Sequence, residues 1–285
     1  MHHFKIIIEL TRLNKPIGFM LLFWPCSWGL AFAYYYNQNI NQFIYYLFLF
    51  FLGSVLMRSA GCIFNDIVDK DYDKKVKRTK KRPIAAGKIS SFQSFLYVII
   101  FCIFAFIILI QFNLFTIFLG LSSMLLAFSY PFMKRITYWP QLFLGITFNW
   151  GIIMAWAAMH NSISSEILIL YTAAIFWTLG YDTIYGAQDM SDDEIIGLKS
   201  TAIKFKKNIK LFLTISYLIS IVLLTYLFKE ILGLNLFTLF LILFIFTLIF
   251  QLIYFDEKKN KNYLNLFKLN NFSGFLLFLG ICFIN

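Results

Sequence analysis

Nine apolar segments, most of them about as long as a bilayer is thick, follow one another along the chain with only short breaks. A helix that crosses a bilayer needs roughly 20 predominantly apolar residues. Only 14% of the 285 residues are charged, whereas a soluble domain carries roughly a quarter. We therefore predict an all-α integral membrane protein, with residues 1–285 as one membrane-embedded domain. The expected spans are residues 16–36, 43–64, 94–111, 113–132, 139–159, 166–187, 209–228, 233–254 and 270–284.

The basic residues predict how these spans are oriented. When successive loops are assigned to alternate sides, nearly all of the 25 lysines and arginines fall on the side of the N-terminus. Cytoplasmic loops are the ones enriched in lysine and arginine. The N-terminus is therefore expected in the cytoplasm, with residues 4–15 as an amphipathic segment at the membrane surface. The expected location is the inner membrane of a bacterial cell.

Two clusters of aspartates lie at the ends of expected spans, far apart in sequence. On one helix, Asp66, Asp69 and Asp73 would fall within an arc of about 60°. The second cluster repeats the pattern at the end of residues 166–187. Both clusters fall on the predicted cytoplasmic side, and the segments 65–73 and 181–194 that contain them hold nine of the chain's 14 acidic residues.

The second cluster consists of Asp182, Asp189 and Asp193, which on one helix would fall within an arc of about 40°. Like charges that share a helical face repel each other. The aligned carboxylates therefore require a cation, and Mg²⁺ bound by carboxylates commonly bridges to substrate phosphates. The repeated spacing predicts a diphosphate substrate held by Mg²⁺ between the two faces.

Basic and polar residues near the clusters complete the candidate site. Arg58 lies inside an apolar span, where an ionisable residue usually has a function. Asn65 and Tyr185 flank the carboxylates and are candidates for orienting them or the substrate. The candidates for diphosphate binding are Lys77, Arg78, Arg82 and Lys199. A diphosphate bound at a membrane is expected to carry a lipid tail.

Three other interpretations bear on the same features. The carboxylates could form a solvated acidic loop balanced by nearby lysines, although this does not explain the repeated spacing. They could line the pathway of a divalent-cation transporter, although such residues are expected nearer the bilayer midplane. Binding to nucleic acid would need a soluble basic fold, which the sequence does not contain. Membrane lipids are expected partners, and the sequence indicates no obligate protein partner.

The two clusters resemble the aspartate motifs of the UbiA superfamily of intramembrane aromatic prenyltransferases. Residues 65–73 match the pattern NDxxDxxxD, and residues 182–193 match DxxYxxxDxxxD. Flanking strings, such as Lys15-Pro16-Ile17-Gly18 and Tyr130-Pro131-Phe132-Met133-Lys134-Arg135, resemble the branch that uses 4-hydroxybenzoate. The similarity runs from residue 12 to about 205. Asn14 and Gly186 depart from the usual residues without touching a motif aspartate.

The resemblance implies helices packed around a central cavity with a lateral opening for the isoprenoid. It also implies a reaction in ubiquinone biosynthesis that transfers a polyprenyl group from polyprenyl diphosphate to the ring carbon ortho to the hydroxyl of 4-hydroxybenzoate. Another acceptor, such as homogentisate, dihydroxynaphthoate or a glycerol phosphate, is an alternative. Metal binding would fall to the six motif aspartates with Asn65, and Arg58 or Arg135 would bind the benzoate carboxylate.

Overall fold

A computed structural model of the chain describes residues 2–256 and 262–284. In these residues nine helices are long and apolar enough to cross a membrane. They are α2 (Ile17–Asn37), α3 (Ile40–Val68), α5 (Ser91–Leu109), α6 (Leu114–Ile136), α7 (Pro140–His160), α8 (Ser165–Gly186), α11 (Ile209–Leu227), α12 (Leu236–Tyr254) and α13 (Tyr263–Cys282). The predicted all-α membrane architecture is confirmed.

Polar residues fix the ends of several spans. Asn39 caps the start of α3 by accepting a hydrogen bond from the backbone N–H of Gln42. A capping box between Ser90 and Gln93 starts α5. Such caps satisfy backbone groups that the helix leaves unpaired. The observed ends lie within a few residues of the predicted ones, except that α13 begins at Tyr263 instead of residue 270.

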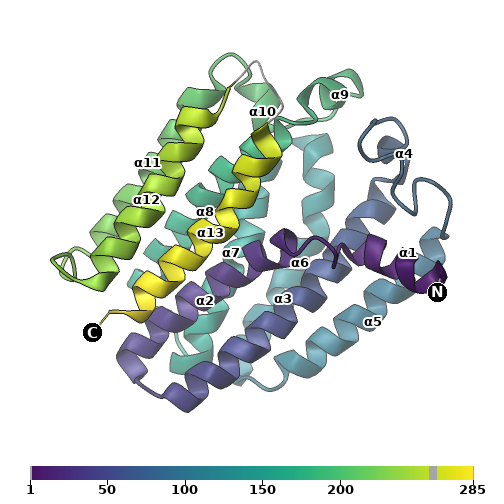
Figure 1. The fold of residues 1–285 in the computed structure, drawn as a ribbon. Helices are drawn as coiled ribbons and strands as arrows, with labels where there is room; N and C mark the ends of the chain where they lie inside the picture. Colours follow the sequence, from purple (N-terminus) through teal and green to yellow (C-terminus); the bar gives the residue numbers. More distant parts are fainter. Residues whose placement is uncertain (1, 257–261, 285) are drawn as a thin grey trace.

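Four short helices lie outside the spans. They are α1 (His2–Thr11), α4 (Lys70–Asp73), α9 (Met190–Ile195) and α10 (Thr201–Lys204). Figure 1 shows α4, α9 and α10 at the end of the bundle where α3 and α8 end, and α4 contacts α3 while α10 contacts α8. The apolar side of α1 packs beside α3 through the buried residues Ile6 and Leu10. The location of α1 at the membrane surface stays a prediction.

Close contact between α2 and α7 forms the centre of the bundle. A Cβ atom added at Gly29 of α2 would lie 2.5 Å from the carbonyl oxygen of Ile152 in α7. Small residues allow helices to approach closely in a membrane. On the other side of α2, the indole of Trp28 donates a hydrogen bond to the carbonyl of Gly274 in α13 (2.8 Å). These contacts place α2 between α7 and α13 (Figure 1).

A buried polar network joins α8, α11, α12 and α13 within the apolar bundle. Asn270 accepts from the indole of Trp177 (2.9 Å) and donates to Gln251 (2.9 Å). Gln251 also accepts from the hydroxyl of Tyr217 (2.7 Å). These four side chains are at most 1% exposed. Water cannot reach these buried groups, so each one depends on its partner in the network for a hydrogen bond. The network therefore fixes the mutual positions of the four helices.

We expect Asn270→Leu to lower the free energy of unfolding by about 2–3 kcal/mol, since it leaves the buried polar groups of Trp177 and Gln251 without a partner. Thermal unfolding in detergent micelles measures the effect. Asn271→Leu is the neighbouring control, because Asn271 makes a single bond to the indole of Trp24 and is only partly buried. An equal loss of stability in both variants would contradict the importance of the network.

Candidate functional site

The first aspartate motif follows the end of α3. The backbone leaves helical geometry at Asp69, which separates α3 from α4. Helical spacing nevertheless persists, because the N–H of Asp73 donates to the carbonyl of Asp69 (2.8 Å). One guanidinium nitrogen of Arg82 donates to both Asp66 (3.0 Å) and Asp73 (2.8 Å). Asp66 and Asp73 therefore face a common point, as their spacing predicts.

Asp66 has a second cationic partner that comes from the N-terminal segment. Arg12, directly after α1, donates to the same oxygen of Asp66 at 2.6 Å. The Asp66 side chain is 1% exposed, so these bonds form where water is largely excluded. Arg12 is absent from the predicted site because residues 4–15 read as a membrane-surface segment. Its position three residues before the Lys15-Pro16-Ile17-Gly18 string is the only signal in the sequence.

Asp69 is fully buried and held by α6 as well as by α3. Its carboxylate accepts hydrogen bonds from Asn65 (3.0 Å) and from Lys134. Arg135 lies 3.4 Å from its other oxygen. Lys134 is absent from the predicted site, because the sequence shows it only as part of the flanking string that ends at Arg135. The α6 residues therefore complete the surroundings of the first motif.

The second motif does not lie on one helix, so the prediction of a single carboxylate face is wrong here. α8 ends at Gly186 and α9 begins at Met190. Between them the backbone N–H of Gln188 donates to the carbonyl of Tyr185, and the N–H of Asp189 donates to the carbonyl of Gly186. Each acceptor lies three residues earlier, whereas in an α-helix it lies four residues earlier. The chain thus turns after Gly186. Asp182 remains within α8, whereas Asp189 lies in the turn after α8 and Asp193 lies in α9.

Arg78 joins the two motifs. It lies in the loop after α4, and its Nε donates to both carboxylate oxygens of Asp189 at 2.8 and 3.0 Å. Its Nη1 donates to the hydroxyl of Tyr185 (3.1 Å), and the guanidinium lies 5.4 Å from the centre of that ring. This bidentate contact brings the loop of the first motif onto the second motif.

A large cavity connects the motifs to the apolar interior of the bundle. Its volume is about 820 Å³, and its polar end includes Asn65, Arg78, Asp182, Asp189 and Asp193. A smaller recess of about 100 Å³ adjoins this end and is lined by both motifs. The remaining walls are largely apolar residues of α2, α3, α5, α6 and α7. One space therefore offers charged groups at one end and an apolar surface along its length.

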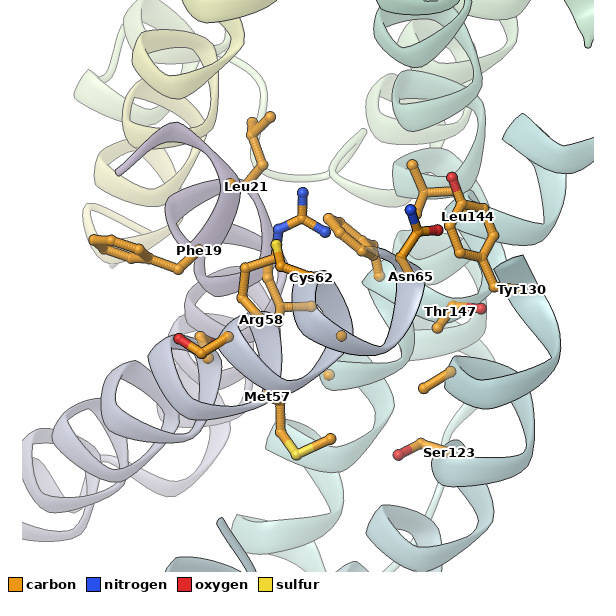
Figure 2. A pocket seen from close by; sticks show the side chains of 18 of the residues that line it. Phe19, Leu21, Met57, Arg58, Cys62, Asn65, Ser123, Tyr130, Leu144 and Thr147 are labelled. Atoms are coloured by element: carbon orange, nitrogen blue, oxygen red, sulfur yellow. The ribbon is translucent and has the colours of Figure 1, made fainter. Parts of the chain in front are cut away.

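Arg58 reaches into the cavity from α3, about two helical turns from Asn65. Figure 2 shows it among the lining side chains, with Tyr130 and Ser123 of α6 on the opposite wall. Its guanidinium lies 5.2 Å from the centre of the Phe148 ring. Its buried Nε has no hydrogen-bond partner among the described residues. Arg58 thus presents a cation to the cavity with no carboxylate bound to it in the described part of the chain.

Three predicted substrate-binding residues do not line the cavity. Lys77 is exposed on the loop after α4. Lys199 donates to the carbonyl of Ile136 (3.1 Å), at the end of α6. Arg135 donates to the carbonyl of Val68 (2.7 Å), at the end of α3. The last two satisfy helix C-terminal carbonyls, a favourable location for cations.

The protein's own cations do not fully neutralise the carboxylates of Asp193 and Asp73. Burial raises the pKa of Asp193 to about 6, and repulsion from Asp189 adds to the effect, against the attraction of Lys134 and Arg78. Burial also raises the pKa of Asp73, which Arg82 opposes. A raised pKa means that the protein alone does not fully stabilise the charged carboxylate. A bound cation would favour the charged form.

The donor set fits Mg²⁺. The six motif aspartates and Asn65 offer hard oxygen ligands, which Mg²⁺ prefers. In the described residues, no three acidic, histidine or cysteine side chains lie close enough to hold an ion by themselves. Mg²⁺ usually retains several waters and binds through one or two carboxylates and substrate phosphates. A site that is completed by a phosphate ligand is therefore consistent with these carboxylates.

We expect Lys134→Met to destabilise the protein by about 3 kcal/mol, because it removes a cation from the buried Asp69 carboxylate. Thermal unfolding in micelles measures the loss. The double variant Lys134→Met/Asp69→Asn should recover much of it, since no buried charge is then left without its partner. Additive losses in the double variant would contradict a direct coupling between the two side chains.

Comparisons with known proteins give similarities over most of the chain. Residues 22–272 match the profile of the UbiA prenyltransferase family. A mitochondrial 4-hydroxybenzoate polyprenyltransferase of Rattus norvegicus is 48% identical over 208 residues, which cover 73% of this chain and 55% of that protein. The human protein of the same name is 50% identical over 204 residues, covering 71% and 54%. The chain thus spans about half the length of the curated relatives it matches.

Two solved structures have a similar fold. An apo UbiA homolog from Aeropyrum pernix K1 has a TM-score of 0.78 at 24% identity, covering 92% of this chain and 96% of that chain. A UbiA homolog from Archaeoglobus fulgidus bound to DMAPP and Mg²⁺ has a TM-score of 0.67 at 17% identity, covering 95% and 98%. At these identities the likeness concerns the fold alone.

Proposed function

Because the chain belongs to the UbiA prenyltransferase family, we propose that it transfers a polyprenyl group from polyprenyl diphosphate to 4-hydroxybenzoate. The new bond forms at the ring carbon ortho to the hydroxyl, and diphosphate is released, as a step of ubiquinone biosynthesis. Residues 1–285 act as one prenyltransferase domain. The observation that carries the proposal is the shared cavity, whose charged end includes residues of both aspartate motifs.

Mg²⁺ is proposed as the cofactor, held by Asn65 and the first-motif aspartates and by Asp182, Asp189 and Asp193. When bound, it would neutralise diphosphate charge and so favour ionisation of the allylic C–O bond. The solved homolog that binds DMAPP and Mg²⁺ supports this use of the metal. Asp182, Asp189 and Asp193 line the charged end of the cavity, and Asp69 and Asp73 line the adjoining recess. Cations that can take up the remaining phosphate charge lie beside them.

Those cations are Arg78, Arg82 and Lys134, which line both the cavity and the recess. They are proposed to stabilise the negative charge that develops on the leaving diphosphate. Tyr185 is proposed to orient Arg78, to which its hydroxyl is hydrogen-bonded. Lys77 and Lys199 remain weaker candidates, because neither lines the cavity.

The acceptor is proposed to bind with its carboxylate on Arg58. This residue lines the cavity and has a buried nitrogen without a partner among the described residues. Arg135 is the weaker candidate, since it is bound to the end of α3 outside the cavity lining. The ring carbon would attack the allylic cation, forming a C–C bond. The displaced ring proton would pass to a carboxylate or to the released diphosphate.

The apolar walls support this chemistry in two ways. They give the polyprenyl chain a surface to bury, and they limit the water that could trap the allylic cation as an alcohol. A cation transporter would need polar ligands along its whole path. Lining residues from α5, such as Val98, Ile103 and Phe106, offer none.

The location is proposed from charge and hydropathy together. The chain is a multi-pass membrane protein, because nine helices in the described residues are long and apolar enough to cross a membrane. We place it in the inner membrane of a bacterial cell, with the N-terminus and both aspartate motifs in the cytoplasm. The relatives named above are mitochondrial, so the membrane itself has to be established by fractionation of the source cell.

An acceptor panel tests the proposed function. Membranes that contain the full chain are incubated with labelled polyprenyl diphosphate, Mg²⁺ and one of 4-hydroxybenzoate, homogentisate, dihydroxynaphthoate or glycerol phosphate. We expect a labelled lipid product with 4-hydroxybenzoate and little with the others. Preferential labelling of another acceptor would replace the proposed substrate, whereas no labelling of any acceptor would contradict prenyl transfer.

A further inference from the structure

Helix α3 lines the cavity along much of its length, from the charged end to the apolar end. Leu49, Gly53, Met57, Gly61 and Asn65 all line the cavity. They are spaced four residues apart, so they form a row that winds about 160° around the helix between Leu49 and Asn65. Two of the five are glycines, and the row begins at the first residue of the aspartate motif. The cavity wall on α3 therefore lacks a side chain at two places.

These glycines differ from others in the bundle. A Cβ atom added at Gly29 would lie 2.5 Å from a backbone oxygen of α7, and one at Gly145 would lie 3.0 Å from a backbone oxygen of α8. Close helix contact is the common reason for glycine in a membrane span. A Cβ atom at Gly53 or Gly61 would meet nothing within 4 Å. Helix packing therefore explains Gly29 and Gly145 but neither Gly53 nor Gly61.

Glycine has a cost in a helix interior, where most other residues are more favourable. Glycine commonly occurs where a backbone must leave space for a ligand. At Gly53 and Gly61 the space next to the backbone is cavity, and a larger side chain would project into it without striking the protein. The two positions thus widen the cavity beside α3.

Their depths differ. At 1.5 Å per residue, Gly61 lies about 6 Å along the helix from Asn65 and Gly53 about 18 Å. Near the level of Gly53 the apolar end of the cavity includes the rings of Phe50 and Phe112, whose centres are 5.0 Å apart. The turn that carries Phe112 is fixed, because Asn113 donates to the carbonyl of Ala157 (2.8 Å). Gly53 therefore lies beside the far end of the cavity, away from the motifs.

We propose that Gly53 determines which polyprenyl chain lengths the cavity accepts, by leaving room for isoprene units distant from the diphosphate. The inference rests on the proposed function. Gly61, close to the motifs, leaves room for the first isoprene unit and the acceptor. A side chain at Gly53 shortens the cavity, whereas a side chain at Gly61 obstructs it for every substrate.

The test compares diphosphates of increasing length with the full chain in micelles, Mg²⁺ and 4-hydroxybenzoate. Gly53→Leu is expected to lower kcat/KM with a long polyprenyl diphosphate about tenfold or more relative to geranyl diphosphate, since even one methylene too many is discriminated about tenfold in an apolar pocket. Gly61→Leu should lower kcat/KM for both. An unchanged ratio in Gly53→Leu would overturn the inference.

Two controls separate cavity shape from folding. Phe48→Leu changes α3 at a side chain that is 58% exposed and outside the cavity lining, so the ratio should stay that of the unaltered chain. Gly53→Ala should unfold at the same or a higher temperature, because nothing obstructs its Cβ. A lower unfolding temperature in Gly53→Ala would mean that the glycine is needed for packing, which would also overturn the inference.

A binding measurement keeps the inference distinct from the proposed function. The rise in unfolding temperature that each prenyl diphosphate produces with Mg²⁺ requires no acceptor. If the unaltered chain transfers no prenyl group, the proposed function fails. The thermal shifts still test the inference, which requires Gly53→Leu to lose the shift with the long diphosphate and to retain it with geranyl diphosphate.

Discussion

Asp182→Asn is expected to lower the rate of prenyl transfer by about a thousandfold or more, because metal-ion stabilisation of developing charge contributes several kcal/mol. Asp182 lines the cavity from within α8. No ion pair holds its carboxylate in the described residues, so the amide should leave the fold intact. Turnover of labelled polyprenyl diphosphate with 4-hydroxybenzoate is measured beside thermal unfolding.

Asp71→Asn is the matched control for this change. Asp71 lies within the first motif segment, but its side chain is 82% exposed and paired with Lys74. It lines neither the cavity nor the recess. We expect Asp71→Asn to keep nearly full activity. Comparable turnover in Asp182→Asn and Asp71→Asn would contradict the assignment of the second motif.

Arg58→Met is expected to lower kcat/KM for 4-hydroxybenzoate by about thirtyfold to five thousandfold, because loss of one partner of a buried charge pair costs roughly 2–5 kcal/mol. The loss should be far smaller for the neutral analogue 4-hydroxybenzamide. Stability should hold or increase, since Arg58 is an ionised group in an apolar span. The ratio of kcat/KM for the two acceptors is the measurement.

Arg135→Met is the control for the arginine. Arg135 donates to the carbonyl of Val68 and lies 3.4 Å from Asp69, so its loss should reduce stability and leave the preference for the carboxylate acceptor intact. The opposite pattern, with the preference lost in Arg135→Met and kept in Arg58→Met, would exchange the roles proposed for the two residues.

Hydropathy predicted the membrane architecture because a span must satisfy its own backbone hydrogen bonds and face lipid with apolar side chains. The start of α13 was missed for a related reason. Lys268, Asn270 and Asn271 interrupt the apolar pattern there, yet Asn270 is fully buried in the polar network of α8, α11 and α12. Partners on other helices turn a polar residue into a core residue, and the sequence alone does not identify them.

The sequence predicted which carboxylates belong to the candidate site, but it predicted only some of the basic residues that bind them. The spacing of the aspartates allows a prediction of which carboxylates share one face of a helix. That prediction was correct for Asp66 and Asp73, and it failed for the second motif because the chain turns after Gly186. The pairing of Arg12 with Asp66 joins residues 54 positions apart, and that of Lys134 with Asp69 joins residues 65 positions apart. No local pattern reports such contacts.

Binding of one diphosphate by both motifs tests the account most directly. The full chain is titrated with a non-reactive prenyl thiodiphosphate in the presence of Mg²⁺ by calorimetry, beside Asp69→Asn and Asp189→Asn. We predict one ligand per chain, with either substitution alone weakening the affinity by about a hundredfold, since truncating one partner of a buried hydrogen-bonded charge pair costs roughly 2–5 kcal/mol. Unchanged affinity in either variant, or two independent sites per chain, would contradict a single site shared by the two motifs.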